Sequence, residues 1–318
     1  MSPRVRLLAN VAVGVALCAL AQPAGAVEVK YLYRLSNFSG VIPYSDVEMC
    51  ADPAHDEIYV GEGDLIRVFN ASGMEIYDFS HDAMSYGAIL DIGVMPSGDI
   101  LVLSYRQPTE ARAGGSQVTR YNYRGEPLGS FEVHGLPSEL AGFTPNRLAI
   151  RQDSLVFAST ASLLVVTTDF EGTYRRHVDL LATLPKNDKA REGAELGGFY
   201  VDDQGAILYT IPTAFRAFRL KPDGTADSWG KPGSGPGSFS VVGAILAAPN
   251  GYTLVADRAR GAVLVFDPSL RFVREFGNRG PIVEQLNRPG LMVFGRDGKL
   301  YVSQLGYHGL SVFALTTP

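Results

Sequence analysis

The sequence predicts an all-β protein, a six-bladed β-propeller of four-stranded blades. Four short runs rich in β-branched and aromatic residues, joined by turns, occur six times along the chain. The second runs of these copies begin about 48 residues apart, a period typical of propeller blades, near Ile58, Ile100, Leu155, Ile207, Thr253 and Leu300. One four-stranded sheet cannot bury both of its faces, whereas six sheets packed radially can.

Residues 1–26 read as a secretory signal peptide. Arg4 and Arg6 precede an apolar stretch over 7–20, and Ala24-Gly25-Ala26 forms a small-x-small cleavage site. Leu17 stands where a lipoprotein signal needs a small residue, which argues against lipidation of Cys18. The stretch is short for a membrane span, and no later segment approaches the roughly 20 apolar residues required. We therefore expect an exported protein, periplasmic or extracellular, with no transmembrane segment.

We expect residues 27–318 to form a single propeller domain. The copies follow in order at 47–79, 89–131, 147–178, 198–229, 242–276 and 290–315. The last copy stops after its third strand, 310–315, while the strand-like stretch 29–35 has no blade of its own. Pairing these two leftovers would protect two open edges. We expect the N-terminal strand to close the last blade.

The fifth copy carries a family resemblance. In residues 230–277 a glycine-rich lead-in ends in Gly-x-Phe, and an apolar strand, Asn-Gly, "LVAD", a basic loop, "VLVFD" and "EFG" follow. This stretch resembles the NHL repeat, and 286–304 resembles the start of another. The Asp after the second strand occurs only as Asp257, and the likeness is weak in the third and fourth copies. The resemblance implies an interaction platform, or less commonly a lyase or a lactonase-like enzyme.

Charge and cysteine content exclude several classes. The formal net charge is −5, or about −7 without the signal peptide, and the chain has no basic run. This charge argues against nucleic acid as a partner. Cys50 stands alone once Cys18 is removed, so we expect no internal disulfide, although export would permit one. The chain also lacks the Cys-x-x-Cys-His motif of covalent haem.

Acidic and amide residues at the start of the innermost strands form one candidate site. Carboxylate and amide oxygens are suitable calcium ligands, and such residues occur here as Asp46, Glu48, Asp91, Asn146 and Asn287, whereas the fourth and fifth copies have Gly or Val. The candidate zinc ligands are His81, His134 and His308, which lie on connections expected on one rim, although they share no motif. The alternative function is accordingly a metal-dependent hydrolase or lyase, using calcium or zinc at the channel mouth.

Two charged insertions form the other candidate site. Residues 106–117 lengthen a second-to-third-strand loop, and 181–196 lengthen the connection from the third to the fourth copy. Both connection types should open on one rim, where solvated loops or a docking surface are the two interpretations. The sequence favours a monomeric protein-interaction scaffold with no metal or other cofactor. We expect a protein partner to dock on charged residues of this rim. These are Arg106, Glu110, Arg112, Lys186, Lys189, Arg191, Asp257 and Arg258, with Glu192 beside them.

Overall fold

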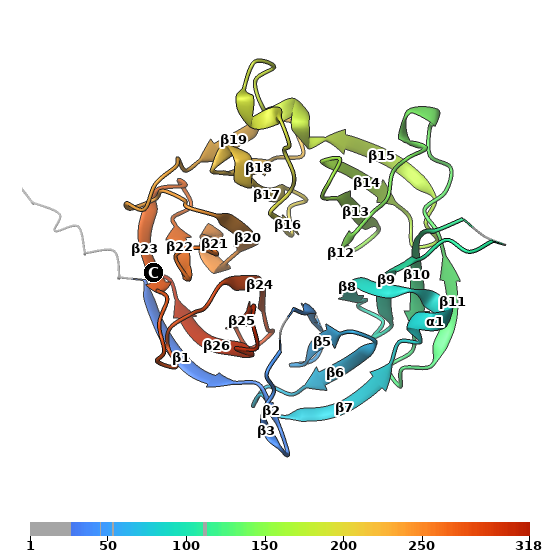
Figure 1. The fold of residues 1–318 in the computed structure, drawn as a ribbon, viewed down its shortest axis with the longest axis horizontal. Helices are drawn as coiled ribbons and strands as arrows, with labels where there is room; N and C mark the ends of the chain where they lie inside the picture. The colour runs from blue at the N-terminus through green and yellow to red at the C-terminus, as the bar shows by residue number, and fades with distance from the viewer. Residues whose placement is uncertain (1–26, 45, 53, 111–112) are drawn as a thin grey trace, which may run out of the picture.

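A computed structural model describes residues 27–44, 46–52, 54–110 and 113–318. These residues form six four-stranded antiparallel sheets arranged as blades around a central channel (Figure 1). The six-bladed propeller is thus confirmed. The proposed signal peptide lies outside the described residues. None of the helices that these residues form is long and apolar enough to cross a membrane.

Each blade follows the same order, with its first strand innermost and its fourth strand at the circumference (Figure 1). The strands of the first three blades are β4 (Glu48–Ala51), β5 (Ile58–Glu62), β6 (Leu65–Phe69) and β7 (Glu75–Ser80); β8 (Ala88–Val94), β9 (Ile100–Arg106), β10 (Gly115–Tyr121) and β11 (Pro127–Phe131); and β12 (Arg147–Ile150), β13 (Leu155–Ser159), β14 (Leu164–Thr168) and β15 (Tyr174–Asp179). Those of the other three are β16 (Gly198–Val201), β17 (Ile207–Ile211), β18 (Arg216–Leu220) and β19 (Ala226–Trp229); β20 (Val242–Ala247), β21 (Thr253–Asp257), β22 (Ala262–Phe266) and β23 (Phe272–Gly277); and β24 (Pro289–Phe294), β25 (Lys299–Gln304), β26 (Leu310–Thr316) and β1 (Glu28–Arg34).

Short elements occupy the connections between blades. A small hairpin, β2 (Ser36–Asn37) and β3 (Gly40–Val41), leads from β1 into blade 1, and the α-helix α1 (Ala83–Tyr86) leads into blade 2. Single 3-10 turns fill other connections and loops: η1 (Ser138–Leu140), η2 (Leu180–Thr183), η3 (Lys189–Arg191), η4 (Pro212–Ala214) and η5 (Pro249–Gly251).

The N-terminal strand closes the ring, as the sequence predicts. β1 pairs antiparallel with β26, in a register that runs from Glu28↔Thr316 to Arg34↔Ser311. The Tyr33 hydroxyl donates a 2.7 Å hydrogen bond to the carbonyl oxygen of Ala71, which belongs to blade 1. The pairing therefore completes the sheet of blade 6, and the same strand holds blade 6 against blade 1.

An aromatic side chain on the outer strand links most neighbouring blades. In four blades it stands opposite the same position of the third strand: Phe79 opposite Ile66, Phe131 opposite Val118, Trp229 opposite Ala217 and Phe276 opposite Val263. In blade 6 this register holds Leu35, whose N–H donates to the Leu310 carbonyl oxygen, and the aromatic ring is that of Tyr33, two residues earlier and opposite Val312. Tyr33, Phe79 and Phe131 lie over glycines of the next blade (Gly73, Gly125 and Gly172) so closely that a Cβ there would clash. Trp229 and Phe276 contact the rings of Phe266 and Phe313 in the next blade, with centroids 5.9 and 5.2 Å apart. We call these five residues the aromatic anchors; in blade 3 the position equivalent to Phe79 holds Val178.

We expect Tyr33→Ala to destabilise the propeller at the closing junction. The variant loses both the hydrogen bond to blade 1 and the ring packed over Gly73, a change of about 2–4 kcal/mol in the free energy of unfolding. Urea denaturation followed by circular dichroism measures it. Phe38→Ala is the matched control, because the Phe38 side chain is 98% exposed and supports no packing. Equal midpoints for the two variants would contradict the role given to Tyr33.

Candidate functional site

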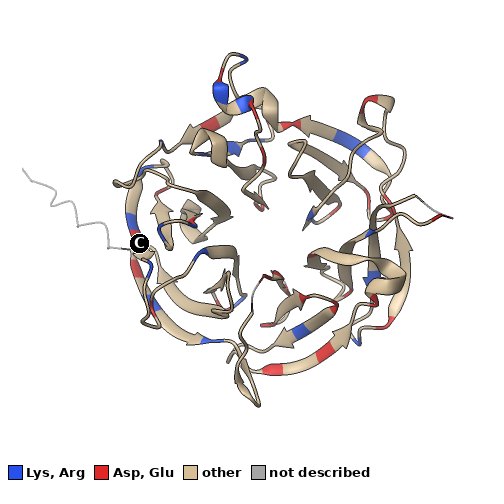
Figure 2. Cartoon of the chain, in the orientation of Figure 1, with Lys and Arg blue, Asp and Glu red and all other residues tan. Residues whose placement is uncertain are grey.

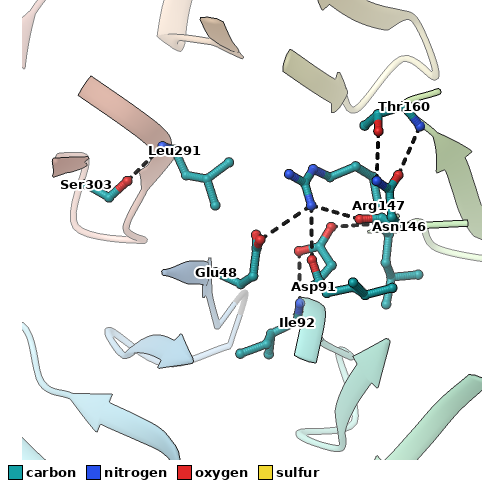
Figure 3. A network of polar contacts seen from close by, with 10 residues as sticks. Glu48, Asp91, Ile92, Asn146, Arg147, Thr160, Leu291 and Ser303 are labelled. Atoms are coloured by element: carbon teal, nitrogen blue, oxygen red, sulfur yellow. Dashed lines mark hydrogen bonds and ion pairs between the residues drawn. The ribbon is translucent and has the colours of Figure 1, made fainter. Parts of the chain in front are cut away.

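The mouth of the central channel holds a network of charged side chains around Arg147, the first residue of β12 (Figure 3). Its Nη1 atom donates to the carbonyl oxygens of Asn146 at 2.8 Å and Leu90 at 3.0 Å, and lies 3.4 Å from Oε1 of Glu48. One guanidinium therefore contacts the inner strands of blades 1, 2 and 3. Such an arrangement fixes its position within the channel.

Asp91 joins blade 2 to blade 3. The register of β8 against β9 shifts between Ile89 and Asp91. Its Oδ2 accepts the backbone N–H of Leu148 at 2.7 Å, and its Oδ1 accepts that of Ile92 at 2.9 Å. Burial raises the pKa of Asp91 to about 6, although Arg147 and the two N–H donors oppose this shift.

Glu48 is the less satisfied acid of the network. Oε1 faces Arg147, whereas Oε2 is buried without a hydrogen-bond partner among the described residues. Burial raises the pKa of Glu48 to about 8; Arg147 opposes the shift, and the nearby carboxylates of Asp91 and Asp46 add to it. The side chain thus holds a proton near neutral pH more readily than an ordinary glutamate.

Arg258 lies across the channel mouth, in the loop after β21. Its backbone N–H donates to the carbonyl oxygen of Val241 at 2.9 Å, and its side chain lies over Gly243. The Nε atom is buried and has no hydrogen-bond partner in the described part of the chain. Burial lowers the pKa of Arg258; Asp46 opposes this shift, while Arg147 and Arg288 add to it. Acidic and basic positions both occur on the segments around the channel (Figure 2).

The oxygen ligands predicted for calcium do not all converge. Glu48 and Asp91 come close to one another, with Arg147 beside both. Asn146 instead closes its own loop, since its Nδ2 donates to Thr160 Oγ1 at 2.8 Å and its Oδ1 accepts the Thr160 N–H at 3.0 Å. Asn287 donates to the Gly280 carbonyl oxygen at 3.2 Å. A cation at this site would have to displace these bonds and lie near a guanidinium.

The histidines do not form a common site either. His81 is fully buried, with Nδ1 2.8 Å from the Tyr121 hydroxyl and Nε2 3.0 Å from the Gly87 carbonyl oxygen, and burial lowers its pKa. His134 and His308 are exposed. Among the described residues, one group of three potential ligands has mutually close donor atoms: Asp52, His55 and Glu57. There Asp52 accepts the N–H groups of Ala54 and His55, an arrangement that orders the turn.

The first insertion borders a hollow on the rim. Arg106 donates to Gln117 Oε1 at 2.5 Å and to Glu132 Oε1 at 3.1 Å, and all three residues line a cavity of about 490 Å³ beside Tyr86. The Arg106 side chain is only 15% exposed, so Arg106 mainly contacts neighbouring protein groups and offers little surface to a partner. Glu110 is exposed. Arg112 lies outside the described residues.

Part of the second insertion is packed against the propeller. Leu184, Ala194 and Leu196 are buried against the core of blades 3 and 4. Arg191 donates to the carbonyl oxygens of Leu181 at 2.6 Å and Leu184 at 2.9 Å, which ties the segment to itself. Lys186, Lys189 and Glu192 remain exposed on this ordered support.

Asp257 and Arg258 do not belong to an open surface. Asp257 is fully buried, and its carboxylate accepts the backbone N–H groups of Ser240, Val241, Ala259 and Arg260 at 2.6–3.2 Å. It therefore orders the loop after β21, and its burial gives no support to direct contact with a partner. Arg258 is half-buried and faces the channel mouth instead of the outer rim.

Sequence reasoning missed the exposed apolar side chains on the same connections. Phe38 is 98% exposed in the β2–β3 hairpin, Met84 is 96% exposed in α1, and Tyr307 is 71% exposed in the loop between β25 and β26. Ile282 and Val241 are also exposed, on the connections into blades 6 and 5. All five lie on fourth-to-first or second-to-third connections. The available signal was a large apolar residue inside a Gly- or Ser-containing connection, as in "NFSG" and "LGYHG".

Comparison with solved structures defines the protein as a β-propeller. The chain is similar to a streptogramin B lyase (TM-score 0.59, 15% identity, 91% of this chain and 98% of the other). It is also similar to the virginiamycin B lyase of Staphylococcus aureus (0.58, 12%, 91% and 100%) and to an auxiliary nutrient binding protein of Bacteroides ovatus (0.61, 13%, 92% and 77%). No protein-family model and no curated protein matches the chain. At these identities the likeness concerns the fold, and the NHL likeness stays a resemblance.

The raised pKa of Glu48 predicts a pH dependence of stability. Between its ordinary value of 4.5 and about 8, the folded protein holds a proton that the unfolded chain releases, so this group's contribution to stability falls as the pH rises. Glu48→Gln should therefore lose less stability between pH 5 and pH 9 than the wild type. Urea unfolding at both pH values measures this, with the exposed Glu139→Gln as control. A wild-type slope in Glu48→Gln would contradict the assignment.

We expect a chelator to leave the melting temperature unchanged. The amides of Asn146 and Asn287 are engaged in their own loops, and Arg147 lies beside Glu48 and Asp91, so a cation would gain few oxygen ligands. Differential scanning fluorimetry with and without EDTA tests this. A ligand that binds the native state stabilises it, so a drop reversed by calcium or zinc would restore the metal-dependent alternative.

Proposed function

We propose that this protein is an exported binding protein whose propeller is a rigid scaffold and whose loop-bearing rim docks a protein partner. The observation that carries the proposal is the exposure of Phe38, Met84 and Tyr307 on connections of one rim. Large apolar side chains held in water at these levels are characteristic of contact surfaces when they recur on one face. Rigid scaffolds commonly carry their binding groups on such loops.

The surrounding charges favour a protein over a small apolar molecule. Lys186, Lys189, Glu192 and Glu110 are exposed on the two insertions and provide both signs of charge. Large exposed apolar side chains separated by charges of both signs are typical of protein interfaces, in which a few large side chains carry most of the binding free energy. The ordered packing of the second insertion supports this, because little loop entropy is lost on docking.

Export supports the same proposal from the sequence. Residues 1–26 have the three regions of a secretory signal, so the partner would be met in the periplasm or outside the cell. We propose that the propeller acts as a monomer toward this partner. The likeness in fold to an auxiliary nutrient binding protein is compatible with a binding role.

We expect the rim variant Phe38→Ser/Met84→Ser/Tyr307→Ser to lose its partner while remaining folded. A photoreactive residue in place of Lys189 should cross-link the partner in the exported fraction. The triple variant should reduce the yield of this cross-link about tenfold or more, because each of the three side chains contributes roughly 1 kcal/mol or more to binding. Mass spectrometry identifies and quantifies the product.

Tyr123→Ser/Leu128→Ser is the matched control. These two apolar residues are 65% and 57% exposed but lie on the third-to-fourth-strand turn and outer strand of blade 2, away from the rim connections. The control should cross-link at the wild-type level. A rim variant that cross-links the partner as strongly as the wild type, with an unchanged melting curve, would refute the docking surface.

A further inference from the structure

The junction between blades 3 and 4 lacks an aromatic anchor. Val178 stands opposite Val165, in the register that holds Phe79, Phe131, Trp229 or Phe276 in four other blades. Blade 6 has Leu35 in this register, but there the ring of Tyr33, two residues earlier, covers Gly73 of the next blade. Gly224, in the turn of blade 4 that this side chain would face, has no atom within 4 Å of the position of a Cβ. The equivalent glycines of blades 1 to 3 are each covered by a ring. A short side chain thus leaves uncovered a site that an aromatic ring fills at the other junctions.

A cavity of about 580 Å³ lies at this junction. That volume falls within the range of small-molecule sites, about 300–1,000 Å³. Its floor is apolar and comes from strands of both blades: Val156, Val165, Val178, Val201, Ile207 and Leu220. The cavity is therefore a preformed apolar pocket between two blades, and Ala182 and Thr183 at the start of the second insertion also line it.

Acidic and basic side chains both line the edge of the cavity: Asp153, Asp179 and Asp203 beside Arg151, Arg176 and Lys221. Arg151 pairs with Asp203 at 3.3 Å, and Lys221 pairs with Asp227 at 3.2 Å. Arg176 also lines the cavity, and it makes no ion pair within the described residues. It stands on β15 two residues before Val178, so both side chains lie on the same face of the strand. An occupant that fills the space beside Val178 would reach the guanidinium of Arg176.

We propose that this cavity binds a small aromatic carboxylate of one or two fused rings. The ring takes the place that the aromatic anchors occupy at the other junctions, over Gly224 and against Val165 and Val178. The carboxylate faces Arg176, because a guanidinium matches a carboxylate by charge and by its planar donors. Filling the gap also joins blades 3 and 4 as an aromatic anchor does, so binding stabilises the ring.

Titration with 2-naphthoate tests the site in the full mature chain. Isothermal titration calorimetry should show one equivalent bound, and saturating ligand should raise the melting temperature. Val178→Phe supplies the missing anchor and should weaken binding at least tenfold. Val273→Phe, a matched control on the outer strand of blade 5, should bind like the wild type. Absence of 2-naphthoate binding to the wild type, or equal binding by Val178→Phe, would overturn the proposal.

The charge of the ligand is tested separately. Arg176→Gln should weaken 2-naphthoate about threefold to fivefold, as expected for one exposed ion pair, and leave the neutral 2-naphthalenemethanol unchanged. This substitution is on an exposed side chain and should not affect folding even if Val178→Phe does. Octanoate serves as the aliphatic probe: tighter binding than 2-naphthoate would overturn the aromatic assignment. An unchanged affinity of Arg176→Gln for 2-naphthoate would overturn the placement of the carboxylate.

Discussion

The propeller depends on the contact that the outer strand of each blade makes with the following blade. Hydrogen bonds hold strands together within a blade, but between blades the described contacts are mainly packing of side chains. The aromatic anchors supply this packing at the circumference, where blades diverge and the space between them is widest. Near the channel the blades converge, and small residues suffice: Gly198 lies against the backbone of Gly243 and Ala244. Large residues outside and small residues inside give each blade the wedge shape that six copies need to close a ring.

The sequence predicted the architecture well because the pattern of one blade repeats six times along the chain. Each copy repeats the same strand and turn signals, so an error in one copy would not change the count. Pairing of β1 with β26 followed from two strands that had no other partner. The aromatic anchors were also visible in principle, since four copies have Phe79, Phe131, Trp229 or Phe276 at or next to the end of the outer strand, and the N-terminal strand has Tyr33. Val178 becomes informative only when the register places it at the same position.

The candidate sites were harder to predict because they depend on contacts between blades. Nothing in the local sequence shows that Asp91 accepts the N–H of Leu148, 57 residues away, or that Arg147 reaches Glu48, 99 residues away. Asn146 and Asn287 have suitable ligand atoms, but each spends them on its own loop. Arg191 and Asp257 carry charges that suggest a surface role, whereas backbone groups around them take up their bonding capacity. Residue type can be read from a sequence, but what each side chain contacts cannot.

Closure by β1 has a consequence for the order of folding. Within blades 1 to 5 every strand pairs with a neighbour in sequence, so each blade can form from local contacts as soon as its own residues are available. Blade 6 differs, because β1 and β26 lie at opposite ends of the described chain and must meet across all five other blades. In a flexible chain that separation carries a large entropic penalty, but blades already assembled bring the two strands near each other. The ring thus acts as its own template, and its final joining step is the one most sensitive to disorder elsewhere in the molecule.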